Sequence, residues 1–394
     1  MTHRGLPRNC LLVAAMCMGS GAKAGVWVTE PLLGLAAEYS TNPGLLYAAH
    51  TAETHGAVLI DTPTKYHGDS VNLSVQPSFR ISDSSGYSSL ASDYAHLTVK
   101  GEIDSERNSV GVTGQIARDS SLYYNYGLNG SAGVRRDTSL ADVAWVRALT
   151  ERTNFNLEAN SSRVLYGKSG SFTTLTDYRY TSTAPSLALN TSERTTLTLL
   201  GGAGLYDSAD LRTKSVNSNF QLGIKRQITE LWAVSANAGY SRETNTIEEY
   251  FGPFLLGTFR AANTGSVFMA NVTRQGSLFD VTAAASRSLV PSGFSFLSLQ
   301  NSYQLSFHYP RTERWTFDGH ARWLKSQEPQ VSGPTVDQSY LDLGLSAAWL
   351  FTEKWTLTLR ASRVTAKYTP PSINVGASGF AIQLSRQFDP VKWH

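Results

Sequence analysis

The stretch Phe351-Thr352-Glu353-Lys354-Trp355-Thr356-Leu357-Thr358-Leu359-Arg360 decides the fold, because closely similar stretches return along the whole chain. Each consists of a short polar turn followed by a segment in which apolar and polar residues alternate. A Glu, or once a Gln, marks these turns at positions 106, 151, 193, 230, 275, 313 and 353, so neighbouring turns lie 37 to 45 residues apart. A period of about 40 residues indicates one repeated structural unit.

The alternating segments have the length and composition of membrane-crossing strands. Segments such as 33–40, 71–82, 299–309 and 341–351 alternate with a period of two, which places apolar and polar residues on opposite faces of a strand. Segments of about 10 residues cross a bilayer as tilted strands. Only 16% of the residues are charged, whereas 18 Tyr, 16 Phe and 8 Trp are present. Soluble proteins carry about 25% charged residues, so part of this surface is expected to lie outside water.

Two soluble folds also give alternating strands, namely a β-sandwich and a β-propeller whose blades repeat at a similar period. A propeller blade needs four short strands, whereas each repeat here has two long strands, one short turn and one longer loop. Tryptophans also gather near the short turns, as an aromatic girdle at a membrane interface does: Trp145, Trp232, Trp315, Trp349 and Trp355. The sequence therefore predicts an all-β chain that forms a single transmembrane, antiparallel, up-and-down β-barrel.

The connections predict the number of strands. Eight short turns and nine longer loops give 17 connections and hence 18 strands, or 16 if the weak segments near 56–66 and 263–272 are not strands. An even number of strands places both termini on the side of the short turns, which is the periplasm in bacterial barrels.

The first 24 residues have the pattern of a cleaved signal peptide. A basic start with Arg4 and Arg8 precedes an apolar core from 10 to 18, and Ala22-Lys23-Ala24 forms the cleavage site. A lipoprotein acylated at Cys17 is the alternative, but Met16 stands where a small residue is expected. We therefore expect residues 1–24 to be removed and residues 25–394 to form the barrel.

Removal of the signal changes the chemistry of the chain. Both cysteines, Cys10 and Cys17, are lost, so a disulfide or a thiolate metal site is not expected. Three of the 34 basic residues are lost as well, which leaves 31 basic against 31 acidic residues. A chain without a basic excess has no electrostatic support for binding nucleic acid.

No catalytic motif appears in the sequence: H-E-x-x-H, G-x-S-x-G, Walker and EF-hand patterns are missing, and the histidines form no metal pattern. Asp318 and His320 share the polar face of one strand and are compatible with a hydrolytic dyad. A polar wall around a water-filled lumen explains them better, because no serine or further acidic group stands at a suitable spacing. We therefore expect no enzyme activity, no cofactor and no metal.

A barrel of 16 to 18 strands leaves an aqueous channel unless loops block it. Strand parity directs charged residues of both signs into this channel: Glu38, Arg80, Lys100, Glu102, Glu158, Lys225, Asp318, His320, Arg322, Asp342 and Arg360. Because both signs are present, we expect weak ion selectivity.

One connection stands out by its apolar content. Residues 244–262 are predicted to be a long loop, and its centre contains Tyr250, Phe251 and Phe254. An exposed apolar run needs a partner, so this loop is expected to constrict the lumen, to contact another protein or a glycan outside, or to pack against neighbouring loops.

The last strand and the repeated turns carry a family resemblance. Phe380, Ile382, Leu384 and Phe388 resemble the C-terminal signal that the barrel-assembly machinery reads, although Arg386 interrupts the row and six residues follow Phe388. Together with the T-E-R-x-x-L-x-L turns and the opening strand 33–42, this strand resembles the outer-membrane β-barrel porin families of Gram-negative bacteria, in particular barrels encoded near exopolysaccharide and exosortase systems.

The resemblance implies an integral outer-membrane protein that contacts lipid and the barrel-assembly machinery. The likeness to barrels encoded near exopolysaccharide systems further implies contact with polysaccharide or with components of an export system. Two functions follow as hypotheses. The first is a conduit for small solutes or an exported polysaccharide. The second is a non-conducting structural barrel whose extracellular loops bind partners.

Overall fold

The computed structural model describes residues 25–43, 45, 52–83, 93–120, 134–167, 175–208, 212–251, 254–293, 297–328, 336–369 and 372–393. The predicted signal peptide, residues 1–24, lies outside the described residues. Among the residues that are described, no helix is long and apolar enough to cross a bilayer.

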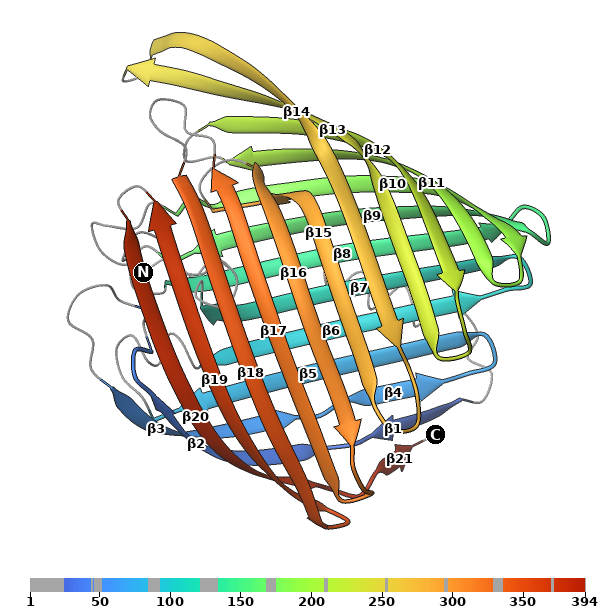
Figure 1. Cartoon of the computed structure of the whole chain (residues 1–394), viewed down its shortest axis with the longest axis vertical. Coiled ribbons are helices and arrows are strands. Elements are labelled where there is room, and N and C mark those ends of the chain that lie inside the picture. Colours follow the sequence, from blue (N-terminus) through green and yellow to red (C-terminus); the bar gives the residue numbers. More distant parts are fainter. Residues whose placement is uncertain are drawn as a thin grey trace.

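The chain forms one antiparallel β-barrel (Figure 1). Its strand segments are β1 (Val26–Thr29), β2 (Leu32–Ser40), β3 (Glu53–Asp61), β4 (Thr64–His67), β5 (Val71–Ser82), β6 (Tyr94–Asp104), β7 (Asn108–Ser120), β8 (Arg135–Ala148), β9 (Thr153–Tyr166), β10 (Tyr178–Ser192), β11 (Thr195–Ser208), β12 (Thr213–Gln227), β13 (Trp232–Phe251), β14 (Phe254–Arg274), β15 (Asp280–Pro291), β16 (Leu297–Pro310), β17 (Trp315–Glu328), β18 (Val336–Thr352), β19 (Trp355–Thr369), β20 (Ile373–Gln387) and β21 (Val391–Trp393).

Eighteen strands make up the barrel wall, which confirms the predicted number. The first and last of them, β2 and β20, pair from Leu32↔Gln387 to Ser40↔Gly379 and close the barrel. The weak segment near 56–66 is a single strand with a break: β3 and β4 pair with successive parts of β5 on either side of residues 62–63. Proline lacks an N–H group, so Pro63 interrupts the ladder at this break.

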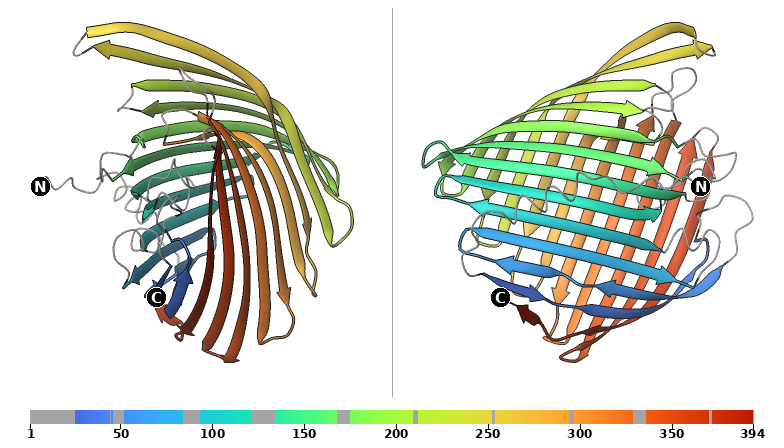
Figure 2. Two further views of the ribbon diagram at one scale, coloured as in Figure 1. Left: turned by 60° about the vertical axis from the view of Figure 1, so that its left-hand side comes forward. Right: turned by 180° about the vertical axis from the view of Figure 1, so that it is seen from behind.

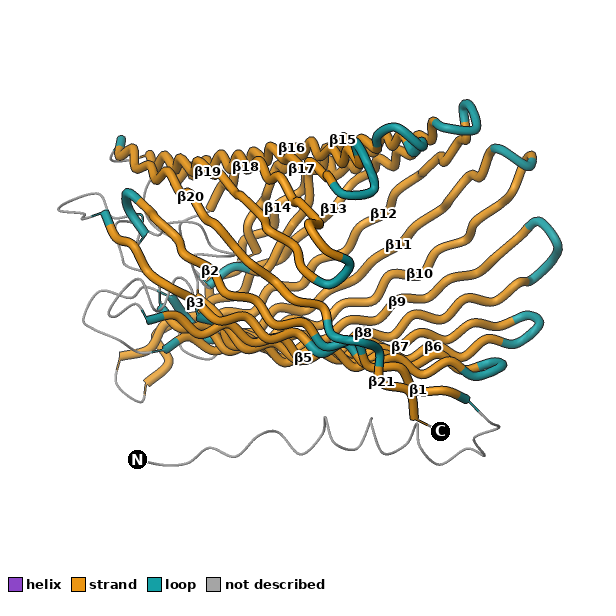
Figure 3. Tube along the Cα trace, turned by 90° about the horizontal axis from the view of Figure 1, so that it is seen from below, coloured by secondary structure: helices purple, strands orange, loops and turns teal. Residues whose placement is uncertain are grey.

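The two ends of the described chain meet on the side of the short turns. β1 pairs with β4 on one edge and with β21 on the other, for example Trp27 with Trp393. The residues that follow Phe388 therefore form a short strand, β21, which extends the pairing of β4 and β1 at the turn end of the barrel. Figure 3 shows β1 and β21 side by side there.

The repeated turn has a physical cause in its first residue. The Oγ1 atom of Thr352 accepts a hydrogen bond from the backbone N–H of Trp355 at 3.1 Å, and Thr312 and Thr229 do the same for Trp315 at 3.0 Å and Trp232 at 3.1 Å. A threonine that bonds the backbone in this way stabilises a tight turn and starts the next strand. The recurring Thr-Glu pattern is thus the signature of the hairpin turns.

Alternate residues of each strand lie on opposite faces of the wall. Large apolar side chains such as Leu35, Leu222 and Leu345 are exposed on the outer face, whereas their neighbours in sequence point inward. On the outer face Trp315 and Trp349 stack at 5.7 Å near the turn end, and Tyr303 and Trp323 lie 5.2 Å apart nearer the loop end. The outer wall is therefore an apolar band with aromatic residues toward both ends.

The prediction of a long loop at 244–262 is wrong. The ladder between β13 and β14 continues from Trp232↔Arg274 to Phe251↔Phe254, so nearly all of this segment is strand. Backbone pairing outweighed the expectation from composition, because each added rung satisfies the hydrogen bonds of two residues. The resulting hairpin projects beyond the rim of the neighbouring strands (Figures 1 and 2).

Candidate functional site

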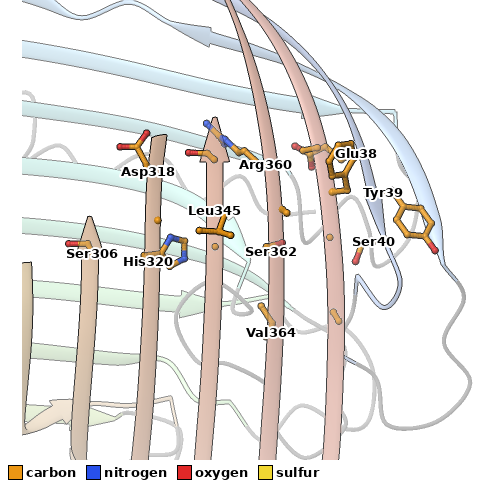
Figure 4. A pocket seen from close by; sticks show the side chains of 18 of the residues that line it. Glu38, Tyr39, Ser40, Ser306, Asp318, His320, Leu345, Arg360, Ser362 and Val364 are labelled. Carbon is orange, nitrogen blue, oxygen red and sulfur yellow. The ribbon is translucent and has the colours of Figure 1, made fainter. Parts of the chain in front are cut away.

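The candidate site is the inner wall of the barrel. A cavity of about 840 Å³ runs along the inside of β15–β20 and β2, from Asp280 near the turn end to Leu45 near the loop end. Four of the predicted pore-lining residues line it: Glu38, Asp318, His320 and Arg360. Figure 4 shows these side chains on neighbouring strands of the wall.

Histidine–carboxylate pairs connect the strands across this wall. Nδ1 of His308 lies 2.6 Å from Oδ1 of Asp318, and Nε2 of His320 lies 3.4 Å from Oδ2 of Asp342. Asp318 and His320 therefore have different partners on neighbouring strands instead of forming one dyad with each other. The side chains of His308, Asp318 and His320 are about half exposed and that of Asp342 is 24% exposed, so both pairs give the wall polarity and contribute little to stability.

A second charged cluster lies where the first strands meet. A guanidinium nitrogen of Arg80 lies 2.5 Å from Oε1 of Glu38, and Nε2 of His55 lies 3.3 Å from Oε2 of the same carboxylate. His55 and Arg80 are buried, whereas Glu38 remains partly exposed. Glu38 thus connects this cluster to the cavity.

A third cluster lies near the loop end of β6, β7 and β8. Asp119 accepts two hydrogen bonds from the Arg136 guanidinium, at 2.9 and 3.1 Å, and His96 lies 3.4 Å from the same carboxylate. The side chains of Asp119 and Arg136 are only 2% and 7% exposed. Such a buried, bidentate pair holds its strands in register, because separating the two charges would remove a charge-assisted contact that offsets their desolvation.

The remaining predicted pore-lining residues lie elsewhere on the strands. Arg322 is opposite Asp342 in the β17–β18 register, while four others are exposed and lie outside the cavity, on β6, β9 and β12: Lys100, Glu102, Glu158 and Lys225. Within the described residues, no group of three or more His, Cys, Asp or Glu is placed to hold a metal ion.

The structure adds a narrowing of the loop end that sequence reasoning missed. The ends of β15 and β16, residues 289–293 and 297–299, fold into the barrel mouth, and we call them the tucked tip. Tyr206 donates a hydrogen bond from its hydroxyl to the backbone oxygen of Ser292 at 2.8 Å, and the N–H of Thr176 donates to Gly293 at 2.8 Å. Only β12, β13 and β14 separate β11 from β15 along the wall, so these bonds bridge one part of the mouth.

Apolar side chains reinforce this contact between the tucked tip and the inner wall. Leu297 is buried against three tyrosines of the inner wall, Tyr166, Tyr178 and Tyr206, and Leu289 packs beside them. Tyr178 and Tyr206 stack at 5.3 Å. A second apolar cluster on β17–β20 packs against Leu45, which lies five residues after β2: Leu324, Tyr340, Ala366 and Val375. Alternating sequence patterns place these residues inward but give no sign that other segments cover them.

Other predicted residues take the following places. Trp145, Trp232, Trp315, Trp349 and Trp355 lie at or near the turn ends of their strands. Phe380, Ile382 and Leu384 belong to β20, and Phe388 follows it, with the guanidinium of Arg386 over its ring at 4.9 Å. The side chains of Tyr250, Phe251 and Phe254 lie outside the described part of the chain, although their backbone forms the tip of the β13–β14 hairpin.

These features define the class of the molecule: a closed, 18-strand, up-and-down β-barrel with an apolar outer band and a polar lumen. No family model matches the chain, and no curated protein matches its sequence.

Solved barrel structures resemble it. The outer membrane protein OpdK from Pseudomonas aeruginosa aligns with 12% identity and a TM-score of 0.45, covering 93% of this chain and 99% of that one. OccK9 (OpdG) of the same organism aligns with 14% identity and a TM-score of 0.47, covering 91% and 98%. The ferric citrate transporter FecA aligns with 8% identity and a TM-score of 0.48, covering 91% and 79%. Likenesses at this level assign no solute, partner or direction of transport to this chain.

Proposed function

We propose that the protein is a passive outer-membrane pore for small, water-soluble solutes. The observation that carries this proposal is the polar, mixed-charge cavity inside a closed barrel whose outer band is apolar. Solvent-exposed carboxylate, imidazole and guanidinium groups favour water and hydrated solutes over an apolar filling.

The narrowed mouth favours small solutes over an exported polysaccharide. The tucked tip occupies part of the loop end and is held by hydrogen bonds and by buried leucine and tyrosine side chains. A polymer would have to displace the packed tip for as long as the polymer passes through the mouth, whereas a small solute needs only a gap beside the tip. Charges of both signs line the path, so we expect weak preference between anions and cations.

The orientation is part of the proposal. Both ends of the described chain lie on the side of the short turns, and bacterial barrels place short turns in the periplasm. We therefore propose periplasmic termini, contact of the outer band with outer-membrane lipid, and assembly through the barrel-assembly machinery with β20 as its signal. An epitope tag after residue 394 should then be inaccessible in intact cells and accessible after permeabilisation.

Single-channel recording in planar bilayers tests the pore directly. Ser346 lines the cavity and its neighbour Ala347 lies on the outer face of the same strand, so they form a matched pair. Ser346→Trp should reduce the conductance, whereas Ala347→Trp should leave it unchanged. A barrel that is folded, as judged by heat-modifiable gel mobility, but gives no conductance steps would overturn the pore and support a structural barrel whose loops bind partners.

A further inference from the structure

The pairing between β14 and β15 ends within the depth of the membrane and leaves a gap in the ladder on one side of the barrel. β14 pairs with β13 along its whole length, but with β15 only over seven rungs, from Arg274↔Val281 to Phe268↔Arg287. Seven rungs of a strand tilted by about 40° rise roughly 18 Å, whereas the apolar band of a membrane barrel is about 25 Å tall. On the side toward β15, the described residues 257–267 of β14 have no strand partner.

Beyond the last rung the two edges overlap instead of meeting. Ser241 and Glu243 of β13 face inward, and they line a cavity of about 200 Å³ together with Leu289 and Leu299, which belong to the outward-facing rows of β15 and β16. The inner face of the β13–β14 hairpin therefore covers the outer face of the tucked tip. Figures 1 and 2 show the β13–β14 hairpin, in yellow, continuing past the loop ends of the strands beside it. We call this overlap the seam.

The two walls of the seam cavity differ in chemistry. One wall is apolar, with Leu289, Leu297 and Leu299. The other is polar: Glu243 lies opposite Asn263 in the ladder, and Ser241 lies opposite Gly265. A cavity with one apolar and one polar wall fits neither water alone nor lipid tails alone.

Glu243 determines which head group the polar wall can bind. This residue is only 3% exposed and lines the cavity beside Asn245 and Asn263, which hydrogen-bond its carboxyl group. Its Oε1 atom has no hydrogen-bond partner within the part of the chain that the structure describes. A buried carboxylate oxygen without a donor costs free energy unless a ligand supplies one. A cationic or hydrogen-bond-donating head group would do so, while an alkyl chain would cover the leucines.

We propose that the seam is a lateral binding site for a single-chain amphiphile with a cationic head, entered from the membrane between β14 and β15. Backbone groups exposed to hydrocarbon are costly, so the unpaired edge of β14 must face protein, water or a ligand and not lipid tails alone. The site goes beyond the proposed pore, because it needs no solute passage through the lumen.

Photolabelling of the full barrel in phosphatidylcholine liposomes tests the site. The probe is dodecylammonium with a diazirine at the end of its chain, and labelled peptides are mapped by mass spectrometry. We expect adducts enriched at Leu289, Leu297 and Leu299 over the other outward-facing leucines. Equal labelling of all outward-facing leucines would mean simple partitioning into the bilayer and would overturn the site.

Two glycines provide a matched pair of variants. A Cβ atom added at Gly265 or at Gly114 would meet no heavy atom within 4 Å, so both positions accept a larger side chain. Gly265 lines the seam cavity, whereas Gly114 lies on β7. Gly265→Trp should fill the cavity and abolish the enrichment, and Gly114→Trp should keep it. Unchanged labelling in a folded Gly265→Trp barrel contradicts the proposal.

Glu243→Gln tests the role of the carboxylate. In the unaltered protein, dodecylammonium should label the seam more strongly than the diazirine-bearing dodecanoate of the same length. Glu243→Gln should reduce this ratio by about tenfold or more, the scale of one charge-assisted hydrogen bond. An unchanged ratio would refute the head-group assignment. Single-channel conductance, recorded on the same variants, reports the pore separately, so a failure of the seam site leaves the pore proposal standing and the reverse also holds.

Discussion

Leu345→Arg is the most informative single substitution in the outer wall. On β17, Trp315 and Trp323 belong to the aromatic pairs at the two ends of the apolar band, and Gly319 lies four residues from each. Leu345 is the register partner of Gly319 and is 61% exposed on the outer face. Eight residues of a tilted strand rise roughly 21 Å, so Leu345 lies at the middle of the band.

An arginine at this depth should cost about 2–4 kcal/mol of unfolding free energy, because its guanidinium group must either lose its hydration or distort the bilayer locally. Leu341 is the register partner of Trp323 at the loop-side end of the band, and Leu341→Arg should cost only about 0–1 kcal/mol, since the head reaches the interface. Equilibrium unfolding in urea from liposomes, followed by gel mobility, measures both. Equal costs for the two variants would refute the assigned depth.

The inward-facing neighbour provides the control. Ser346 lines the lumen cavity between Asp318 and Arg360 in the register, so an arginine there remains in water. Ser346→Arg should fold with nearly unchanged stability and alter the conductance. A loss of stability as large as that of Leu345→Arg would show that the two faces of β18 are assigned the wrong way round.

Three further predictions concern the inner wall. Asp119→Ala should cost about 3–5 kcal/mol of unfolding free energy, because it removes the bidentate carboxylate partner of the buried Arg136 guanidinium, and a double-mutant cycle with Arg136→Ala should show that the two losses are not additive. Arg360→Glu should shift the reversal potential toward cation preference, since it replaces a positive charge by a negative one on the cavity wall. Tyr206→Phe removes the hydrogen bond to Ser292, so conductance should increase or fluctuate more as the tucked tip loosens; identical single-channel traces would contradict the proposed role of the tip.

The sequence predicted the wall of the barrel well because strand parity is a local property. The eighteen strands and the positions of the short turns followed from alternation and from the Thr-Glu turns, in which a threonine bonds the backbone three residues on. The loop at 244–262 was predicted wrongly because its apolar residues were interpreted by composition alone. A strand continues wherever a partner strand satisfies its backbone, whatever its composition.

The lumen was predicted only in part. Parity places Asp318 and His320 on one face, but their actual partners, His308 and Asp342, depend on the register of three neighbouring strands. Likewise, no sequence pattern indicates that Glu38 contacts both Arg80 and His55. Register is the relation between two strands, and a single alternating pattern leaves it open.

The sequence by itself determined that the chain is a strand-and-turn repeat with one face suited to lipid and the other to water, because neighbours in the chain set both the period and the turns. Only the tertiary structure decided that the mouth is narrowed and that the wall overlaps itself at the seam. Tyr206 and Ser292 are 86 residues apart, and Glu243 and Leu289 meet at a cavity beside the point where β14 and β15 stop pairing. Such contacts arise from how far each hairpin extends past its neighbour, which depends on the packing of the whole barrel and not on any local stretch of the chain.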